Sequence, residues 1–393
     1  MKLLKIMFLL IFSLIFNLII SGESCFVVAS DSEVSVSYPV GLDATVIEKA
    51  VSGISEEKIL QIMEKLCGKE FLGREYGTET GRKSAEYLAS ELQSYGYTPT
   101  INEDGFFQNI PEGTYRTCPE AGQNVMAILP GSDPQLAKKY IVLCAHYDHL
   151  GFRDVPIKTK RESIFHFLPE TVSDEKDGGA SEDVESKKSR RIIYPGADDN
   201  ASSVTVLLSV AKALKELPVT PKYSILFLFF DGEEKGLLGS RFWITHPTIP
   251  LEDVILAINL DMTGRLDKQS RLYIFSTRTG TKLKDWYQES NDSSEPLQLI
   301  FPWSNLLRSD HAVFVGKGIP ASMMATGLSP AYHTPEDTVD KINIPGMKRI
   351  TIFLCRTVLQ MACAESEISE YRKEWYREKC PVEDEMSGFF DKK

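Results

Sequence analysis

Apolar positions along this chain recur with two periods, one typical of amphipathic helices and one typical of buried strands. Residues 56–66 and 80–95 carry apolar side chains at helical spacing, which predicts two helices. From residue 139 onward, short continuous apolar runs alternate with helical patterns. The predicted strands cover residues 98–102, 124–129, 139–145, 223–230, 254–260, 272–276 and 319–324, and the later predicted helices cover residues 201–217, 236–245, 282–291 and 346–364.

Strands that alternate with helices form a mostly parallel sheet whose two faces are covered. We therefore predict an α/β fold with a mostly parallel central sheet covered by helices on both faces. Residues 153–191 interrupt the pattern because they are dense in charge, and we predict a long polar loop there. Residues 365–393 are also highly charged and predict a solvated C-terminal tail.

The N-terminus has a pattern of its own. Lys2 and Lys5 precede an apolar run at residues 6–20, which is the layout of a secretory signal peptide. We predict a signal peptide at residues 1–30, an N-terminal extension at residues 31–55, and a secreted or periplasmic protein. The alternative is an uncleaved membrane anchor, although the run is short for a full span of about 20 residues.

Composition argues against some partners and sites. The chain has 393 residues and a net charge of −11, which argues against a nucleic-acid partner because phosphate binding needs clustered Lys and Arg. Its seven cysteines permit disulfides in an exported chain but specify none. The sequence has no C-x-x-C pair, so a structural zinc–thiolate site is unsupported.

Two adjacent acids, Glu233 and Glu234, follow the apolar run at residues 223–230. Neighbouring carboxylates repel each other, so that one of them is expected to hold its proton. A metal ion removes this conflict, because its positive charge allows both groups to ionise. The pair therefore indicates a metal site if other ligands lie near it.

Other candidate ligands also follow predicted strands. His146 and Asp148 come directly after the strand at residues 139–145, and Asp261 follows the strand at residues 254–260. Ligands of open α/β sheets bind outside the carboxyl ends of the parallel strands. We therefore expect these side chains to meet the two glutamates.

Two further segments complete the set. Asp198 and Asp199 precede the helix at residues 201–217, where acids also serve as caps, and His333 lies in the loop after the last predicted strand. Two histidines and three acids suit two zinc ions if one carboxylate bridges them, which leaves a fourth acid as a base. The residues alone leave Asp198 and Asp199 interchangeable.

Together these segments resemble the M28 family of co-catalytic zinc aminopeptidases. The resemblance covers residues 56–364 in motif order, and we predict a peptidase domain over this range. The sequence has no H-E-x-x-H motif, so the single-zinc metalloprotease class is excluded. The matching motifs are His146-Tyr-Asp148, Gly196-Ala-Asp-Asp-Asn-Ala-Ser202, Asp231-Gly-Glu-Glu-Lys-Gly-Leu-Leu-Gly-Ser240, Asn259-Leu-Asp-Met262, Ser309-Asp-His311 and Tyr332-His-Thr334.

The resemblance implies a phosphorylase/hydrolase-like zinc exopeptidase architecture with two zinc ions per chain. His146 and Asp261 would complete one zinc site. Glu234 and His333 would complete the other. Asp199 would bridge both ions.

The resemblance also implies the catalytic groups. Glu233 would be the general base, and Tyr332 would donate a hydrogen bond to the oxyanion. Asp148 would orient His146. The acids expected beside the ligands, without binding metal themselves, are Asp148, Asp198 and Asp310.

The function implied is an exported di-zinc aminopeptidase, which hydrolyses the N-terminal peptide bond of peptides or proteins through a zinc-bound water and a glutamate base. One alternative is a glutaminyl cyclase-like acyltransferase with a single zinc. Another is a catalytically silent binding domain of the same fold. The number of zinc ions per chain separates these three hypotheses.

Some features of the chain have no counterpart in the resemblance. The loop at residues 153–191 is longer than expected, and its place beside the site would let it shield the cleft. Among the remaining histidines, we expect His166 and His246 at the surface and a hydrogen-bonding role for His311. No partner or role is predicted for His149.

Overall fold

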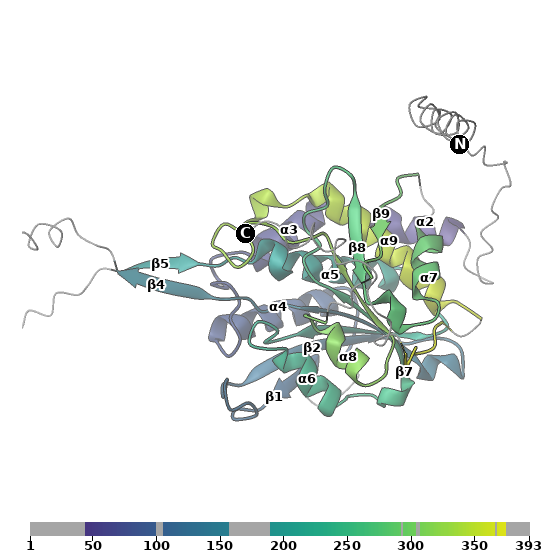
Figure 1. Cartoon of the computed structure of the whole chain (residues 1–393), viewed down its shortest axis with the longest axis horizontal. Helices are drawn as coiled ribbons and strands as arrows, with labels where there is room; N and C mark the ends of the chain where they lie inside the picture. Colours follow the sequence, from purple (N-terminus) through teal and green to yellow (C-terminus); the bar gives the residue numbers. More distant parts are fainter. Residues whose placement is uncertain are drawn as a thin grey trace, which may run out of the picture. The chain divides into compact units, whose positions relative to one another are not determined.

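A single eight-stranded sheet organises the computed structural model, which describes residues 44–99, 105–156, 189–291, 294–303, 307–365 and 368–374 (Figure 1). The strand order is β1-β2-β6-β3-β7-β10-β8-β9. The strands are β1 (Phe107–Ile110), β2 (Gly122–Leu129), β3 (Tyr140–His146), β6 (Ser224–Phe230), β7 (Val254–Leu260), β8 (Arg271–Phe275), β9 (Gln298–Ile300) and β10 (Ala321–Ala325).

The centre of the sheet is parallel and its flanks are mixed. Strands β6, β3, β7 and β10 run parallel to one another. On one side β2 is antiparallel to β6 and β1 to β2, and on the other side β8 is antiparallel to β10. The predicted mostly parallel α/β sheet is confirmed. Because the four central strands end at the same edge, the residues that follow them are brought together.

Alternating side chains of the strands build a core on each face of the sheet. On β6, Phe227 and Phe229 join the larger apolar cluster, whereas Leu228 and Phe230 join a second cluster. The larger cluster is packed under α2 (Ala44–Ser52), α3 (Glu56–Leu66), α4 (Glu79–Ser94), α5 (Ser203–Lys215), α7 (Leu283–Ser290) and α9 (Ile344–Ala362). The second cluster is packed under α6 (Leu238–Thr245) and α8 (His311–Gly316).

Polar caps set the beginnings of three helices. Ser55 caps α3 by accepting a hydrogen bond from the backbone of Lys58, and Thr78 caps α4 in the same way through Gly81. Asn343 caps α9, which has a proline in its first turn. These contacts place the observed helix boundaries within about two residues of the predicted ones, which is the usual uncertainty of helix ends.

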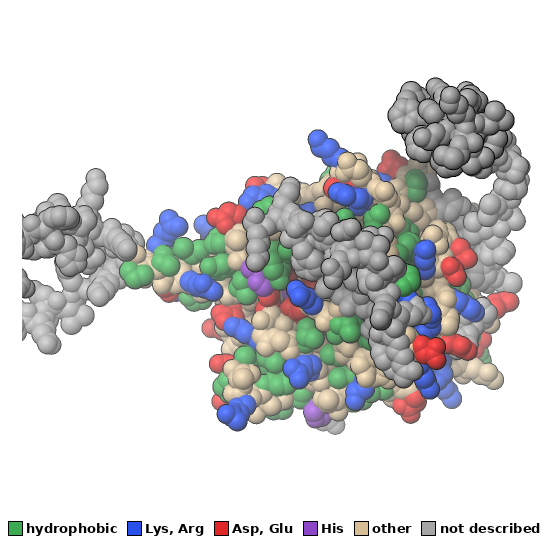
Figure 2. Space-filling view, viewed as in Figure 1, with side chains coloured by type: hydrophobic (Ala, Val, Ile, Leu, Met, Phe, Trp, Pro, Cys, Tyr) green, Lys and Arg blue, Asp and Glu red, His purple; other side chains and the backbone are tan. Residues whose placement is uncertain are grey.

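The prediction of an unbroken polar loop over residues 153–191 is wrong at both ends. Strands β4 (Phe152–Pro156) and β5 (Ser189–Ile193) pair as an antiparallel ribbon (Figure 1). Arg191 forms two 3.1 Å hydrogen bonds to the carboxylate of Asp154 and stacks over the Phe152 ring at 3.9 Å. Cross-strand pairs of this kind stabilise a ribbon that the polar composition conceals. Figure 2 shows mixed apolar and basic side chains along it. Residues 157–188, where the predicted shielding loop falls, lie outside the described residues.

The other departures concern short or terminal elements. β1, β9 and α8 were not predicted, and the predicted strand at residues 98–102 falls mostly outside the described residues. α2 precedes the predicted domain start at residue 56 yet packs against α9. After the predicted domain end, the backbone carbonyl of Ile368 accepts a hydrogen bond from the indole of Trp286.

Membrane and disulfide predictions are tested only in part. The predicted signal peptide lies outside the described residues, and no helix in the described part of the chain has the length and apolar character needed to cross a membrane. The described cysteines are free thiols, namely Cys67, Cys118, Cys144, Cys355 and Cys363.

Candidate metal centre

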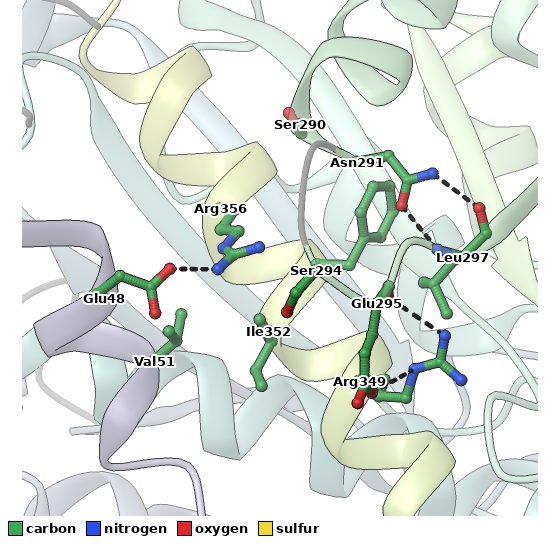
Figure 3. A pocket seen from close by; sticks show the side chains of 11 residues that line it. Glu48, Val51, Ser290, Asn291, Ser294, Glu295, Leu297, Arg349, Ile352 and Arg356 are labelled. Atoms are coloured by element: carbon green, nitrogen blue, oxygen red, sulfur yellow. Dashed lines mark hydrogen bonds and ion pairs between the residues drawn. The ribbon is translucent and has the colours of Figure 1, made fainter. Parts of the chain in front are cut away.

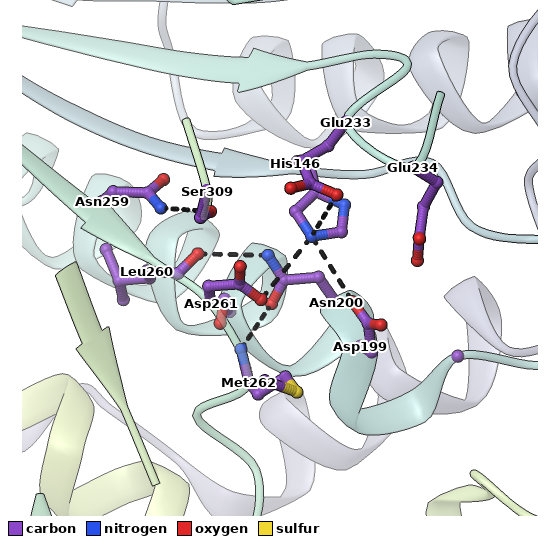
Figure 4. Close-up of polar contacts among 12 residues, drawn as sticks. His146, Asp199, Asn200, Glu233, Glu234, Asn259, Leu260, Asp261, Met262 and Ser309 are labelled. Carbon is purple, nitrogen blue, oxygen red and sulfur yellow. Dashed lines mark hydrogen bonds and ion pairs between the residues drawn. The ribbon is translucent and has the colours of Figure 1, made fainter. Parts of the chain in front are cut away.

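The candidate ligands converge at the carboxyl edge of the parallel strands. His146 is the last residue of β3, Glu233 and Glu234 follow β6, and Asp261 follows β7 (Figure 4). Asp199 lies in a wide turn at Ala197–Ser202, directly before α5, and its own backbone dihedral angles are not helical. The turn carries Asp199 to the sheet edge, and α5 begins two residues later than the predicted helix start at residue 201.

The first cluster is formed by His146, Asp199 and Asp261. The Nε2 atom of His146 lies 3.4 Å from Asp199 Oδ1 and 3.6 Å from Asp261 Oδ1. All three residues are buried, and their ligand atoms lie within 4.8 Å of one another. Figure 4 shows the three side chains pointing toward one another.

The second cluster shares Asp199 with the first. The Nε2 atom of His333 lies 3.1 Å from Asp199 Oδ2 and 3.0 Å from Glu234 Oε2. Asp199 therefore presents Oδ1 to one cluster and Oδ2 to the other. This is the geometry expected of a carboxylate that bridges two metal ions.

The acidic pair Asp198 and Asp199 is separated by its surroundings. Asp198 turns away from the histidines, accepts a 2.8 Å hydrogen bond from the backbone of Gly264 and forms a 3.2 Å ion pair with Arg265. Burial, reinforced by Asp337, raises the pKa of Asp198 to about 7. Of the two residues left open at the sequence level, Asp199 is the one whose carboxylate lies within 4 Å of histidine nitrogens.

Asp148 contacts the two glutamates as well as His146. Its carboxylate accepts backbone hydrogen bonds from Glu233 at 3.0 Å and from Glu234 at 3.2 Å. His146 Nδ1 lies 3.3 Å from the backbone oxygen of Asp148 and 3.6 Å from its carboxylate. Asp148 therefore holds the turn that presents both glutamates, which is more than the predicted orientation of His146.

His149 corrects the prediction, because it does have a partner. Its imidazole is fully buried, and Nδ1 lies 2.8 Å from Glu234 Oε1. Nδ1 also lies 3.9 Å from Asp199 Oδ2. The two residues that pair are 85 positions apart, so no local pattern of the sequence marks the contact.

Asp337 is a further site residue without a prediction of its own. One of its oxygens accepts hydrogen bonds from the backbones of Asp198, at 2.9 Å, and Asp199, at 3.1 Å. Its other oxygen accepts a 2.7 Å hydrogen bond from Arg265. Asp337 lies in the loop that carries His333, so it ties the loops of two candidate ligands together. Its place four residues after His333 was the only available signal.

Asn200 joins the bridging turn to the end of β7. Its side-chain amide donates to the carbonyl of Leu260 at 3.1 Å, and its oxygen accepts from the backbone of Met262 at 3.1 Å (Figure 4). The peptide bond between Asp199 and Asn200 is cis. The two hydrogen bonds of the Asn200 side chain hold the turn at Ala197–Ser202 next to Asp261.

Arg74 is a fully buried arginine that donates hydrogen bonds to four backbone carbonyls and also contacts the side chain of Cys67. It donates to the carbonyl of Tyr147 at 2.8 Å and to that of Gly196 at 2.9 Å. It also donates to Leu66 at 2.8 Å and to Pro195 at 2.7 Å. The arginine therefore links the loops on either side of the ribbon, both of which lead into the candidate ligands.

The electrostatics of the clusters favour a cation. Among the described residues, no salt bridge joins the carboxylates of Asp199, Glu233, Glu234 or Asp261 to a Lys or Arg. Burial opposes the charged form of His146, but Glu233 and the neighbouring acids outweigh it and raise the pKa of His146 well above its usual value. In the described chain, the buried Oδ1 of Asp261 has no hydrogen-bond partner. Histidine nitrogens and carboxylates are ligands that zinc accepts, so this donor set fits zinc.

The remaining predicted residues differ in burial and in their surroundings. Burial raises the pKa of Glu233 well above its usual value; His146 opposes this, whereas Asp261 adds to it. Burial likewise raises the pKa of Asp310 to about 7. Tyr332 is 40% exposed, and its ring stacks on His333 with 3.7 Å between centroids. His246 is exposed, as predicted, and His311 is buried.

A separate cavity of about 250 Å³ lies between α2, α9 and the segment after α7 (Figure 3). Arg356 pairs with Glu48 there, and Arg349 lies 3.7 Å from Glu295. None of the candidate ligands lines this cavity, so it is distinct from the candidate metal centre.

The family model of peptidase family M28 matches residues 124–358, which include every candidate ligand. The chain belongs to peptidase family M28. The predicted family is confirmed, and with it the prediction of an enzyme of the metallo-aminopeptidase class.

The relatives with similar sequences are named aminopeptidases. Aminopeptidase YwaD of Bacillus subtilis is 34% identical over 160 residues, which are 38% of this chain and 34% of that protein. The M28 chain thus matches about a third of the length of YwaD. Probable leucine aminopeptidase 1 of Trichophyton verrucosum is 24% identical over 343 residues, which are 84% of this chain and 80% of that protein.

Solved structures share the fold at low sequence identity. The LapA aminopeptidase of Legionella pneumophila is 20% identical in sequence and has a TM-score of 0.60. The match covers 84% of this chain and 78% of the LapA chain. The zinc aminopeptidase BSAP of Bacillus subtilis is 16% identical in sequence and has a TM-score of 0.56. The match covers 82% of this chain and 98% of the BSAP chain. The glutaminyl cyclase of Porphyromonas gingivalis is 19% identical with a TM-score of 0.54, covering 77% and 97%.

Proposed function

We propose that this M28 protein is an exported aminopeptidase with two zinc ions, which removes N-terminal residues from peptides or proteins. The observation that carries the proposal is the carboxylate of Asp199, whose two oxygens face two separate histidines. A single metal ion would use only one of these clusters. The aminopeptidase names of the relatives support the reaction, and the N-terminal sequence pattern supports export.

Five residues would hold the two ions. His146 and Asp261 would complete the first site. Glu234 and His333 would complete the second, with Asp199 bridging the two. Zinc, when bound, supplies a Lewis acid that lowers the pKa of a water molecule and polarises a carbonyl oxygen.

Glu233 is the proposed general base. Its side chain is 14% exposed, and its Oε2 lies 4.0 Å from His146 Nε2, so it borders the first cluster and can still meet water. Its raised pKa makes Glu233 a stronger proton acceptor than an ordinary carboxylate, as a general base requires. Glu233 removes the proton from the water that attacks the scissile carbonyl carbon. It then delivers this proton to the leaving amine as the carbon–nitrogen bond breaks.

Tyr332 and the surrounding acids would handle the rest of the substrate. The partly exposed phenol of Tyr332 can donate a hydrogen bond to the negative oxygen that develops on the attacked carbonyl. The surplus of carboxylates favours a substrate whose free N-terminal amine is positively charged. That preference supports removal of terminal residues over internal cleavage.

The cyclase-like alternative has one observation in its favour, the structural likeness to a glutaminyl cyclase. That likeness concerns the fold alone. The hypothesis of a single-zinc acyltransferase expects one zinc ion per chain, and a silent binding domain expects no turnover. Metal content and hydrolysis of a peptide with a free N-terminus therefore separate the three functions.

The decisive experiment combines zinc analysis with the variant Glu233→Gln. The native protein is expected to hold about two zinc ions and to release N-terminal residues. Glu233→Gln is expected to keep both ions, because Glu234 is untouched, and to lose at least about 100-fold in kcat because the base is gone.

Glu336→Gln is the matched control, since Glu336 is an exposed carboxylate in the loop that carries His333. It is expected to leave kcat unchanged. Native activity in Glu233→Gln would reject Glu233 as the base. One zinc ion per chain in the active protein would reject the two-metal site.

A further inference from the structure

His149 is a buried imidazole aimed at a candidate metal ligand. Its exposed fraction is 0%, and its Nδ1 lies 2.8 Å from Glu234 Oε1. The other oxygen of Glu234, Oε2, faces His333 Nε2 at 3.0 Å. Glu234 therefore uses one oxygen toward the second cluster and the other toward His149.

The surroundings of His149 hold its ring in place. Its backbone amide donates to the carbonyl of Arg74 at 3.2 Å. A Cβ atom on Gly196 would lie 2.5 Å from the His149 ring, so the glycine backbone packs closely on the imidazole. On another side the ring meets that of His333, with 5.8 Å between centroids and an angle of 70°. These three contacts restrict the position of the imidazole.

The contact with Glu234 sets the tautomer of the imidazole. A carboxylate only accepts hydrogen bonds, so Nδ1 must carry the hydrogen for the 2.8 Å contact to be attractive. The Nε2 atom of His149 has no hydrogen-bond partner among the described residues, and as an acceptor it leaves no buried N–H unpaired. A hydrogen on Nδ1 therefore makes this nitrogen the donor to Glu234.

We propose that His149 is a positioning residue that donates a hydrogen bond to Glu234 and fixes its carboxylate for the second metal ion. The inference rests on the proposed two-zinc site. Asp148, the preceding residue, binds the backbone amides of Glu233 and Glu234. Residues 148 and 149 thus hold Glu234 at both its backbone and its side chain.

The alternative is that His149 itself binds the metal. Two substitutions separate the roles. His149→Leu removes the nitrogen atoms at similar volume, whereas His149→Asn keeps an N–H donor close to the position of Nδ1. Zinc affinity of each site is measured by competition with a chromophoric chelator, without reference to activity.

A positioning role predicts that His149→Leu weakens one of the two zinc sites by about 10- to 100-fold, as is typical for a lost partner of a metal ligand. His149→Asn is expected to stay within about fivefold of the native affinity, because a donor to Glu234 remains. His149→Ala replaces the leucine variant if the latter does not fold. His246→Leu, at an exposed histidine, is expected to leave both affinities unchanged.

Each remaining outcome overturns a defined claim. Native affinity in His149→Leu would show that the contact does not support the ligand. Equal, severe loss in both His149→Leu and His149→Asn would assign His149 as a metal ligand. A native protein that binds no zinc would reject the proposed function itself, which is a different result from a failure of the positioning role.

Discussion

Neighbouring residues of the same type acquire different roles in this protein because of what surrounds each side chain. Asp198 faces Arg265 and a backbone amide, whereas Asp199 faces two histidines. Burial alone would raise the pKa of Asp199, but His146 and His333 outweigh it and hold that pKa well below its usual value. The sequence shows an aspartate at both positions. The contacts of each side chain decide which of the two carboxylates is placed to bind a cation.

Gly196 shows the same dependence on surroundings at a residue without a side chain. Its φ of 57° lies in the left-handed region, and an added Cβ would meet Asp199 O at 2.3 Å and the His149 ring at 2.5 Å. Gly196→Ala therefore combines backbone strain with a clash in the candidate metal centre. We expect it to destabilise the protein and to weaken zinc binding.

Gly113→Ala is the matched control for Gly196→Ala. Gly113 also has a positive φ, of 78°, but a Cβ there would meet nothing within 4 Å. Both variants are expected to lose about 1–2 kcal/mol through the left-handed backbone. Gly196→Ala is expected to lose roughly a further 1–3 kcal/mol through overpacking, measured by denaturant unfolding. Equal losses in both variants would show that the predicted clash is relieved without cost.

At the scale of elements, the accuracy of the predictions followed the length of each apolar run. The central strands β3, β6 and β7 are buried on both faces, so their sequences are continuous apolar runs that are readily recognised. β1 and β9 are three or four residues long and partly exposed. The ribbon of β4 and β5 is held by cross-strand contacts, which a one-dimensional pattern does not contain.

Arg74 joins loops that lie between these elements, so its removal is expected to destabilise the protein. Arg74→Ala would remove the Arg74 hydrogen bonds to the buried carbonyls of Leu66 and Tyr147 and to the partly buried carbonyl of Pro195, whereas the carbonyl of Gly196 keeps a hydrogen bond from Ala201. We expect a loss of at least about 3 kcal/mol in the free energy of unfolding, because each unsatisfied buried acceptor costs on the order of 1 kcal/mol or more.

Arg74→Lys is expected to give an intermediate loss, because it keeps the charge but not the planar fork of donors. The control is Arg82→Ala in α4, where the arginine is 52% exposed and pairs only with Glu86 among the described salt bridges. Its expected change is within about 0.5 kcal/mol. A near-native stability of Arg74→Ala in urea unfolding would contradict the proposed role of Arg74 in linking these loops.

For the molecule as a whole, the concentration of acids at one sheet edge links metal binding to stability. Several buried carboxylates there lack a Lys or Arg partner within the described chain, so their mutual repulsion is relieved by a cation. If the proposed zinc ions bind only the folded arrangement, a thousandfold excess over the dissociation constant would add about 4 kcal/mol of stability.

Removal of zinc by a chelator is therefore expected to lower the Tm by roughly 5–10 °C, measured by differential scanning calorimetry. Addition of zinc after removal of the chelator is expected to restore the original Tm. A chelator saturated with zinc beforehand serves as the control. An unchanged Tm after metal analysis has shown zinc loss would mean that the acids do not depend on a cation for folding.

The sequence by itself determined the α/β class, the order of the central elements and the candidate ligands. Hydrophobic periodicity is a local property that predicts the strands. Because parallel strands end at one edge of the sheet, the residues that follow them are expected to form a site there. Only the tertiary structure decided which aspartate faces both histidines, and that His149, Arg74 and Asp337 belong to the centre. The physical reason is that these contacts join residues far apart along the chain. Arg74 and Gly196 are 122 positions apart, His149 and Glu234 are 85, and Asp337 and Asp199 are 138, so the contacts depend on how the folded loops meet.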